Sequence, residues 1–282
     1  MRVRIATCLK LPELDADEPW LAEALHAAGF DAQLVAWDDP AADWDAPIPT
    51  LIRSTWNYSL HVEAFRAWID RAAAAAPLFN PPAICHANLH KRYLLELAAR
   101  GVPVVPTHLV ERGQTADLPA VAAPWGAPRI VIKPAIGASS RDTERFAPSD
   151  PAAAAHLARL TAQGDALVQP YQTSVEGYGE RSLVCLDGAL SHSVRKTPRF
   201  GGDAEHVAGP FEIAEDERAV AAAALAPYGD LLYARVDLAR DDAGRPMIME
   251  LELLEPSLFL EHQPGAAERL VAALARRLRA PA

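Results

Sequence analysis

Two segments near the C-terminus have the pattern of paired strands that carry acidic residues, and this pattern constrains the fold most. Residues 233–238 (Tyr-Ala-Arg-Val-Asp-Leu) alternate with a period of two, which places Arg235 and Asp237 on the same face. Residues 241–246 (Asp-Asp-Ala-Gly-Arg-Pro) are typical of a hairpin turn. The turn would bring the chain back beside the first strand, so we expect an antiparallel pair.

The returning strand carries two more carboxylates. Residues 247–252 (Met-Ile-Met-Glu-Leu-Glu) place Glu250 and Glu252 on one face among apolar neighbours. Bare carboxylates are costly to bury, and hard cations such as Mg²⁺ take oxygen ligands of this kind beside substrate phosphates. A hairpin with one wet, acidic face would explain the same pattern without a metal. The rest of the chain has to decide between these interpretations.

Composition indicates an ordinary globular protein and argues against two classes of partner. The chain has 282 residues, enough for two or three lobes with cores, and 50% of them are hydrophobic. A net charge of −10 argues against a general nucleic-acid binder. No apolar run approaches membrane-spanning length, and the N-terminus lacks the apolar core of a signal peptide. Three widely spaced cysteines suggest reduced thiols in a cytoplasmic protein: Cys8, Cys85 and Cys185.

The first third of the chain alternates predicted strands and helices, as in a small parallel sheet with covering helices. The predicted strands are 3–9, 31–37 and 49–53, and the predicted helices are 19–28 and 61–76. Arg53, Ser54 and Thr55 end the third strand, at the edge of the sheet where open α/β folds bind ligands. An exposed loop, with Arg53 in a surface ion pair, is the alternative.

The remainder reads as a β-rich region with intervening helices. Residues 80–82 (Asn-Pro-Pro) look like a linker, and residues 88–100 look like one helix that Gly101 ends. Further strands are predicted at 129–134, 166–171, 181–186 and 189–196, and further helices at 152–161, 215–227 and 265–279. Residues 197–210 read as a polar, glycine-containing loop, and we expect this loop to act as a lid.

A lysine at the end of an apolar strand suggests a phosphate site. Lys133 precedes a loop of small residues that includes Gly137, Ser139 and Ser140. Such a loop lets backbone N–H groups and hydroxyls approach phosphate oxygens, and the lysine adds a positive charge. The segment does not match the Walker pattern. A plain turn would explain it equally well.

Taken in order, these parts resemble the ATP-grasp superfamily, of the glutathione synthetase and D-alanine–D-alanine ligase type. The matching segments are 88–91, 101–107, 131–134, 137–140, 168–171, 179–182, 235–237 and 250–252. The resemblance runs through most of residues 86–260. It implies an α/β (α+β) fold in which an N-terminal parallel lobe (1–85) adjoins two α+β lobes (86–168 and 169–282) that clasp ATP, with the metal site in the last.

The resemblance also implies roles for residues of the nucleotide site. Lys91 and Lys133 correspond to the two lysines that contact ATP phosphates, and Arg235 to the arginine that steadies the transferred γ-phosphoryl group. Lys133 and Arg235 would be the catalytic residues. The remaining nucleotide contacts would come from the small-residue loop, from a hinge that reads adenine and from a ribose acceptor: Gly137, Ser139 and Ser140; Gln169, Pro170 and Tyr171; and Glu176.

The three hairpin carboxylates, Asp237, Glu250 and Glu252, correspond to Mg²⁺ ligands of the superfamily. One position departs from the usual pattern, because the metal motif commonly ends Glu-x-Asn and this chain has Glu252 at the third position. An additional carboxylate still suits Mg²⁺. The resemblance therefore implies ATP and Mg²⁺ as cofactors.

A narrower resemblance points to the substrate. Residues 53–58, 191–198 and 252–260 look like the small ATP-grasp group that includes D-cycloserine synthase. This resemblance implies a small amino-acid-like substrate. Its contacts would be Arg53, Ser54, Thr55, Glu255 and Ser257.

The reaction implied is ATP-dependent ligation of a carboxylate to an amine-type nitrogen. The substrate carboxylate would take the γ-phosphoryl group, giving an acyl phosphate and ADP, and the nitrogen would then displace phosphate. Ring closure within one molecule and the joining of two molecules both stay open, as does a homodimer. The alternative function is a regulatory protein that binds nucleotide without turnover. The presence of Arg235 together with three carboxylates favours catalysis.

Overall fold

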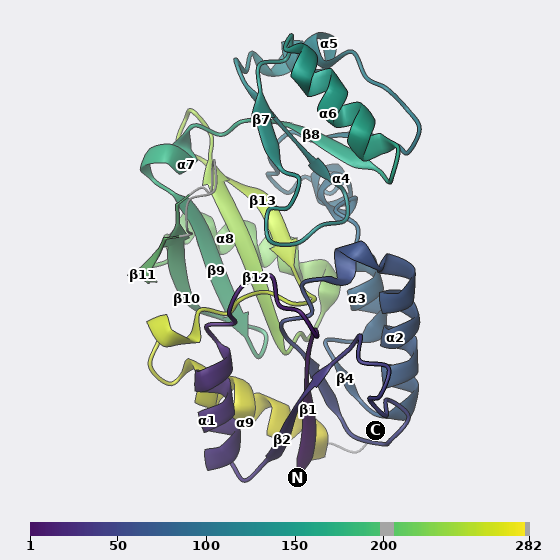
Figure 1. The fold of residues 1–282 in the computed structure, drawn as a ribbon. Helices are drawn as coiled ribbons and strands as arrows, with labels where there is room; N and C mark the ends of the chain where they lie inside the picture. The colour runs from purple at the N-terminus through teal and green to yellow at the C-terminus, as the bar shows by residue number, and fades with distance from the viewer. Residues whose placement is uncertain (198–205, 280–282) are drawn as a thin grey trace.

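The N-terminal sheet is parallel, with strand order β2-β1-β3-β4. Its strands are β1 (Arg2–Thr7), β2 (Asp31–Ala36), β3 (Thr50–Ile52) and β4 (Leu78–Phe79). Helix α1 (Glu18–Ala27) lies on one side of this sheet and helix α2 (Val62–Ala75) on the other (Figure 1). Each helix supplies a crossover of the kind that parallel strands need. The three strands and two helices predicted for this region are confirmed.

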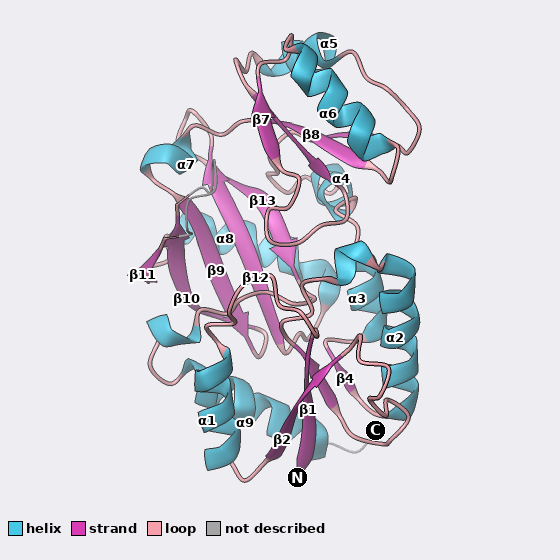
Figure 2. Cartoon of the chain, in the orientation of Figure 1, coloured by secondary structure: helices cyan, strands magenta, loops and turns pink. Residues whose placement is uncertain are grey.

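The central sheet is antiparallel, with strand order β5-β8-β6-β7. Its strands are β5 (His108–Val110), β6 (Ile130–Pro134), β7 (Glu144–Phe146) and β8 (Ala166–Pro170). Helices α5 (Leu118–Ala122) and α6 (Pro151–Thr161) cover one face, and Figure 2 shows them at the far end of the molecule from the chain termini. Strand β6 carries Lys133 near its end, as predicted.

The third sheet is antiparallel and contains the acidic hairpin. Its order is β11-β10-β9-β12-β13, with β9 (Glu180–Leu186), β10 (Ala189–Lys196), β11 (Val207–Phe211), β12 (Tyr233–Arg240) and β13 (Pro246–Glu252). Helix α7 (Ser174–Gly177) precedes β9, and α8 (Glu215–Leu225) precedes β12. The predicted hairpin of β12 and β13 is confirmed, and Asp237 stands opposite Glu250.

Three sequence predictions were wrong in part. The predicted helix 88–100 is two helices, α3 (Pro82–Asn88) and α4 (Tyr93–Ala99), with a break between them. The predicted linker 80–82 leads directly into α3, because proline fits the first turn of a helix. The predicted loop 197–210 contains the start of β11. The computed structural model describes residues 1–197 and 206–279, so most of the predicted lid lies outside the described residues.

Each predicted lobe contributes one sheet, but the packing crosses the predicted boundaries. The C-terminal helix α9 (Ala266–Arg279) packs against α1, so that Leu270 and Leu25 share one core. Leu94 and Leu97 of α4 share another core with Val236 of β12. The lobe limits 1–85, 86–168 and 169–282 therefore stay a prediction.

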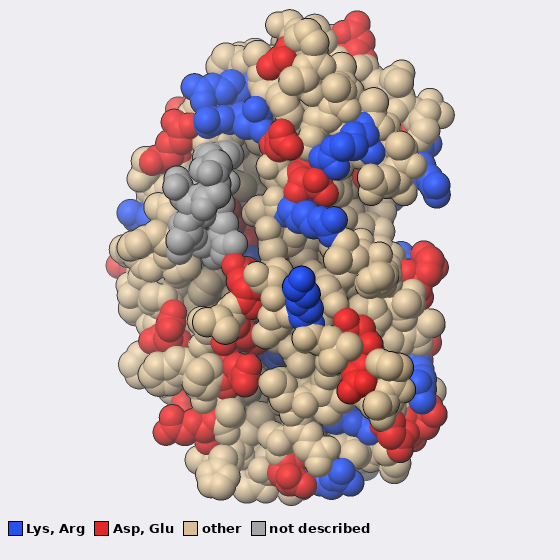
Figure 3. Space-filling view, in the orientation of Figure 1, with Lys and Arg blue, Asp and Glu red and all other residues tan. Residues whose placement is uncertain are grey.

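Two features concern nucleic-acid and membrane partners, namely the charge of the surface and the apolar character of the helices. Figure 3 shows acidic and basic side chains interspersed over the face drawn. Within residues 1–197 and 206–279, no helix combines the length and apolar character that a bilayer crossing requires.

Candidate active site

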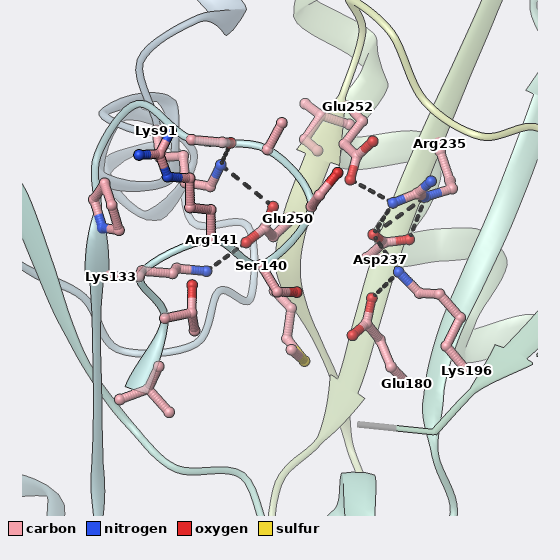
Figure 4. A pocket seen from close by; sticks show the side chains of 18 of the residues that line it. Lys91, Lys133, Ser140, Arg141, Glu180, Lys196, Arg235, Asp237, Glu250 and Glu252 are labelled. Atoms are coloured by element: carbon pink, nitrogen blue, oxygen red, sulfur yellow. Dashed lines mark hydrogen bonds and ion pairs between the residues drawn. The ribbon is translucent and has the colours of Figure 1, made fainter. Parts of the chain in front are cut away.

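A cavity of about 240 Å³ is lined by residues of all three sheets and their loops. Trp56 and Tyr58 enter from the loop after β3, and Lys133 from the end of β6. Charged side chains of β9, β10, β12 and β13 form the opposite wall (Figure 4). Its volume falls just below the range of about 300–1,000 Å³ that is common for small-molecule sites.

Glu250 is held between two lysines in this cavity. Lys133 Nζ lies 2.5 Å from Glu250 Oε1, and Lys91 Nζ lies 3.5 Å from Glu250 Oε2 (Figure 4). Burial raises the pKa of Glu250, but the charges of Lys133 and Lys91 outweigh burial and lower this pKa to about 2. Glu250 is therefore ionised at neutral pH, and both lysines have an anionic partner.

The break between α3 and α4 explains how Lys91 reaches the cavity. The Lys91 amide donates to the Ala135 carbonyl (2.8 Å), and its ammonium donates to the Gly137 carbonyl (2.9 Å). Both acceptors belong to the segment that follows β6. A continuous helix would have kept the Lys91 amide in its own ladder.

Asp237 is held by a second pair of cations. Arg235 donates to it through Nε (2.9 Å) and Nη2 (2.9 Å), because residues two apart on a strand share a face. Lys196 Nζ lies 3.1 Å from Asp237 Oδ2. Burial raises the pKa of Asp237, but Arg235 and Lys196 lower it well below the usual range. Arg235 also bonds Glu252, so it joins two of the expected metal ligands.

Lys196 and Glu180 also line the cavity, although neither was expected from the sequence to have a role in the site. Lys196 ends β10 and forms ion pairs with both Glu180 and Asp237. Burial raises the pKa of Glu180 to about 7, against the lowering effect of Lys196. One signal could have revealed Lys196, since it lies inside the segment 191–198 that carried the narrower resemblance.

A β-bulge places two adjacent residues of β13 on the cavity side. Leu238 pairs with Ile248, but Asp237 pairs with Glu250, so Met249 is the extra residue. The bulge explains why Ile248 and Leu251, three positions apart, both lie in the core. Met249 and Glu250 therefore both line the cavity.

Glu255 faces the cavity beside Tyr58. Glu255 as a whole residue is 8% exposed, and the Trp56 indole donates to its backbone carbonyl (3.0 Å). Burial, and then the nearby charge of Glu252, raise the pKa of Glu255 to about 8. Glu255 is therefore mainly protonated at neutral pH.

The charges that line the cavity are close to balance. Among the described residues that line it, there are five cations and six carboxyls: Lys91, Lys133, Arg141, Lys196 and Arg235; Glu13, Glu180, Asp237, Glu250, Glu252 and Glu255. Two of the carboxyls have pKa values raised to about 7 and about 8. Ionised carboxylates thus do not outnumber the cations at neutral pH.

Most of the expected site residues line this one cavity. They include the phosphate-loop, hinge, metal and cation positions, together with two of the substrate positions: Lys91, Lys133, Gly137, Ser139, Ser140, Gln169, Pro170, Tyr171, Arg235, Asp237, Glu250, Glu252, Glu255 and Ser257. Ser139 and Ser140 have positive φ values of 51° and 53°, which is strained for serine. Strain of this kind is concentrated at ligand-binding loops.

Four expected residues do not line the cavity. Glu176 instead accepts hydrogen bonds from Tyr171 (2.9 Å) and Arg145 (2.8 Å). Arg53 is 1% exposed and donates to Asp17 (2.9 Å) and to the Pro256 carbonyl (2.8 Å). The remaining two, Ser54 and Thr55, are buried within the N-terminal lobe.

These contacts change the expectation for Arg53. The sequence placed it at a strand end, where an exposed guanidinium could meet a substrate carboxylate. In the structure its charge is already paired inside the protein, so it is neither a cavity residue nor a surface ion pair.

The carboxylates expected to bind Mg²⁺ face one cavity but are bonded to cations. In the described parts of the chain, no three Asp, Glu, His or Cys side chains are grouped closely enough to hold a metal ion. Asp237, Glu250 and Glu252 nevertheless supply the oxygen donors that Mg²⁺ prefers, from two paired strands. The donor set therefore fits Mg²⁺ beside phosphates if the cations change partners.

Comparison with known proteins identifies relatives along the whole chain. Residues 3–80 match the family described as the N-terminal domain of D-cycloserine synthetase DcsG. The cycloserine biosynthesis protein DcsG of Streptomyces lavendulae is 39% identical over 295 residues, covering 98% of each protein. The crystal structure of D-cycloserine synthetase DcsG superposes with a TM-score of 0.90 at 36% identity, covering 99% of this chain and 100% of that one.

A more distant structure shows the fold. The ATP-grasp ligase PsnB, complexed with a phosphomimetic variant of a minimal precursor, Mg and ADP, superposes with a TM-score of 0.65 at 19% identity. The match covers 98% of each chain. The predicted ATP-grasp fold is confirmed.

Proposed function

Since the chain belongs to the family of the cycloserine biosynthesis protein DcsG and is an ATP-grasp ligase, we propose that it closes a ring within a small amino-acid-like substrate. ATP would activate the carboxylate of the substrate, and an amine-type nitrogen of the same molecule would then attack it. The comparisons give no support to a regulatory protein without turnover.

One observation carries the ATP-dependent activation in this proposal, namely the pairing of cations with carboxylates across the cavity. Lys133 and Lys91 share Glu250, and Lys196 and Arg235 share Asp237. ATP phosphates would take the lysines as partners, and the released carboxylates would gain the metal ion. The exchange keeps every buried charge compensated, which a lone anion or a lone cation entering the cavity would not do.

Asp237, Glu250 and Glu252 would hold Mg²⁺, which would help to neutralise the terminal phosphates of ATP. The residues of the chain perform the remaining work of positioning. The Lys91 and Lys133 ammonium groups hold the phosphate chain, and the Arg235 guanidinium stabilises charge on the transferred phosphoryl group. Met249 and Tyr171 form an apolar wall for the base.

The proposed reaction has two bond-forming steps. A carboxylate oxygen of the substrate attacks the γ-phosphorus and ADP leaves, which gives an acyl phosphate. The nitrogen then attacks the carbonyl carbon and phosphate leaves, while the nitrogen loses a proton. Glu255 and Ser257 face the cavity where the substrate would sit beside Tyr58.

Release of ADP tests the proposal directly. The protein with MgATP is incubated with a panel of small amino acids that carry a second nitrogen, and ADP is measured. We expect release that depends on one substrate class, and mass spectrometry of the product distinguishes ring closure from the joining of two molecules. ATP hydrolysis that no member of the panel accelerates would contradict the proposal.

A lysine variant tests the phosphate site. Lys133→Ala removes a buried cation, and we expect a loss on the order of 2–4 kcal/mol in ATP affinity or transition-state stabilisation. Lys10→Ala is the matched control, because Lys10 is exposed and does not line the cavity. Equal kinetics for the two variants would remove Lys133 from the phosphate site.

A further inference from the structure

The segment 255–260, which follows the metal strand, is held by side chains at four successive carbonyls. The donors are Trp56 Nε1 to Glu255 (3.0 Å), Arg53 Nη2 to Pro256 (2.8 Å), Arg235 Nη1 to Ser257 (3.1 Å) and His192 Nε2 to Leu258 (2.9 Å). Glu255, Ser257 and Phe259 of this segment line the cavity. The segment thus joins the N-terminal lobe to the cations and carboxylates of the site.

Asp17 holds the amides of the same segment. Its carboxylate accepts from the Leu258 amide (2.5 Å), from the Leu260 amide (2.8 Å) and from Arg53 Nη2 (2.9 Å). Asp17 is 2% exposed and precedes α1, where an aspartate commonly caps the first turn of the helix. Its side chain makes no such capping bond. The carboxylate therefore turns away from its own helix towards a segment more than 200 positions along the chain.

The two amides that Asp17 binds flank a strained residue. Phe259 has φ 51° and ψ 44°, a left-handed conformation that is unfavourable for a bulky side chain. Such a conformation persists where its surroundings fix it, and it is frequent at functional sites. The Arg235 guanidinium lies 5.4 Å from the Phe259 ring centre, within the range of a cation–π contact.

We propose that Asp17 is a positioning residue for ligation, which fixes residues 255–260 and thereby orients both Arg235 and the substrate-facing side chains. Arg235 is held from this segment by the Ser257 carbonyl and by the Phe259 ring. Glu255 and Ser257 face the substrate from the same segment. Arg53 assists by joining Asp17 to the Pro256 carbonyl. The inference rests on the proposed function, because it assigns these groups to substrate and phosphoryl transfer.

Asp17→Asn tests the inference with little change in volume. An amide presents at most one oxygen, so it cannot accept from both backbone amides and Arg53 as the carboxylate does. We expect kcat/KM for the amino-acid substrate to fall about 100-fold, as for misplacement of a reacting group by roughly 1 Å. The KM for ATP should change less than about twofold, because uniform nucleotide contacts remain.

Glu217→Gln is a matched control that makes the same chemical change. Glu217 is 1% exposed, pairs with Arg181 (3.2 Å) and accepts from the Ala214 amide (3.1 Å), but it does not line the cavity. We expect this variant to lower Tm and to leave both KM values unchanged. If Asp17→Asn likewise lowered Tm without moving kcat or KM, Asp17 would be purely structural and the inference would fail.

Two further measurements cover other outcomes. Hydrogen exchange of the peptide that spans 255–260 should be at least about tenfold faster in Asp17→Asn than in Glu217→Gln, since only the former releases these amides. Exchange no faster in Asp17→Asn than in Glu217→Gln would overturn the inference even if no substrate supports ADP release, a result that would instead count against the proposed function. Should Asp17→Asn not fold, Arg53→Lys keeps the charge but loses the fork. Normal amino-acid KM and normal exchange in that variant would overturn the inference.

Discussion

Replacing Glu250 by glutamine should destabilise the protein even in the absence of ligands. Lys133 and Lys91 share this carboxylate, and their side chains are 7% and 11% exposed. Glutamine has nearly the shape of a protonated glutamate and carries no charge. The variant therefore leaves two buried ammonium groups without their common anion, which is the costly way to break a buried ion pair.

The size of the effect follows from the pKa of the carboxyl. Folding lowers the pKa of Glu250 from 4.5 to about 2, which corresponds to about 3 kcal/mol at neutral pH. Its side chain is 24% exposed, so solvent screening makes this figure an upper value. We expect the free energy of unfolding of Glu250→Gln to be lower than that of the wild type by up to this amount at pH 7.

The difference should disappear in acid. Because folding depresses the pKa of Glu250, its stabilisation is complete above pH 4.5 and is lost as the pH falls towards about 2. The wild type then carries a neutral carboxyl as well and resembles the variant. At about pH 3 the difference should have decreased to about 1 kcal/mol.

Urea unfolding of both proteins between pH 3 and pH 8, without nucleotide, measures this difference. Glu23→Gln is the control, since Glu23 is exposed on α1 and its replacement should give no pH-dependent difference. A Glu250→Gln variant as stable as the wild type at pH 7 would refute the reasoning. So would a loss of stability that is the same at pH 3 and pH 8.

Two other variants test neighbouring parts of the structure. Burial raises the pKa of Glu255 to about 8, so the stabilisation from its protonated form is complete below pH 4.5 and is lost as the pH rises through 8. Glutamine has nearly the shape of the protonated form and does not ionise. Glu255→Gln should therefore be more stable than the wild type by about 3 kcal/mol at pH 7 and equal to it near pH 4. Urea unfolding across this range checks the sign, and a variant less stable at every pH would contradict it. Asn80→Leu should lower the free energy of unfolding by about 3 kcal/mol, because it leaves the Tyr233 and Leu253 carbonyls and the Leu232 amide buried without their partner. Thermal unfolding measures this loss, and a shift no larger than that of a surface substitution would show that the three groups find other partners.

Local pattern was sufficient to predict the elements that carry the cavity. Alternation in 233–238 and 247–252 placed Arg235, Asp237, Glu250 and Glu252 on paired strands, and the structure confirms the pairing. The placement of these residues depends only on neighbours a few positions away and on one hairpin turn, so the sequence was enough to predict it.

Contacts between distant segments could not be predicted in this way. No sequence motif pointed to Asp17, and its bonds to the Leu258 and Leu260 amides depend on how two segments far apart in the chain meet. The burial of Arg53 could not be predicted for the same reason, because Arg53 forms its ion pair with Asp17. At the break between α3 and α4, the Lys91 amide donates to the Ala135 carbonyl instead of to its own helix. Helical periodicity in the sequence cannot predict this contact with a distant segment. Strand alternation also cannot anticipate a bulge, because one extra residue reverses the faces beyond it.

The bulge at Met249 lets evolution change two properties separately. Without a residue opposite it in β12, Met249 is not constrained by the pairing of its neighbours, whereas Glu250 is fixed opposite Asp237. Substitutions at 249 can therefore reshape the wall beside Tyr171 and Val175 while the neighbouring carboxylate keeps its place. On the proposed placement of the base against this wall, one substitution at 249 would change which base the enzyme prefers and leave the phosphoryl chemistry intact.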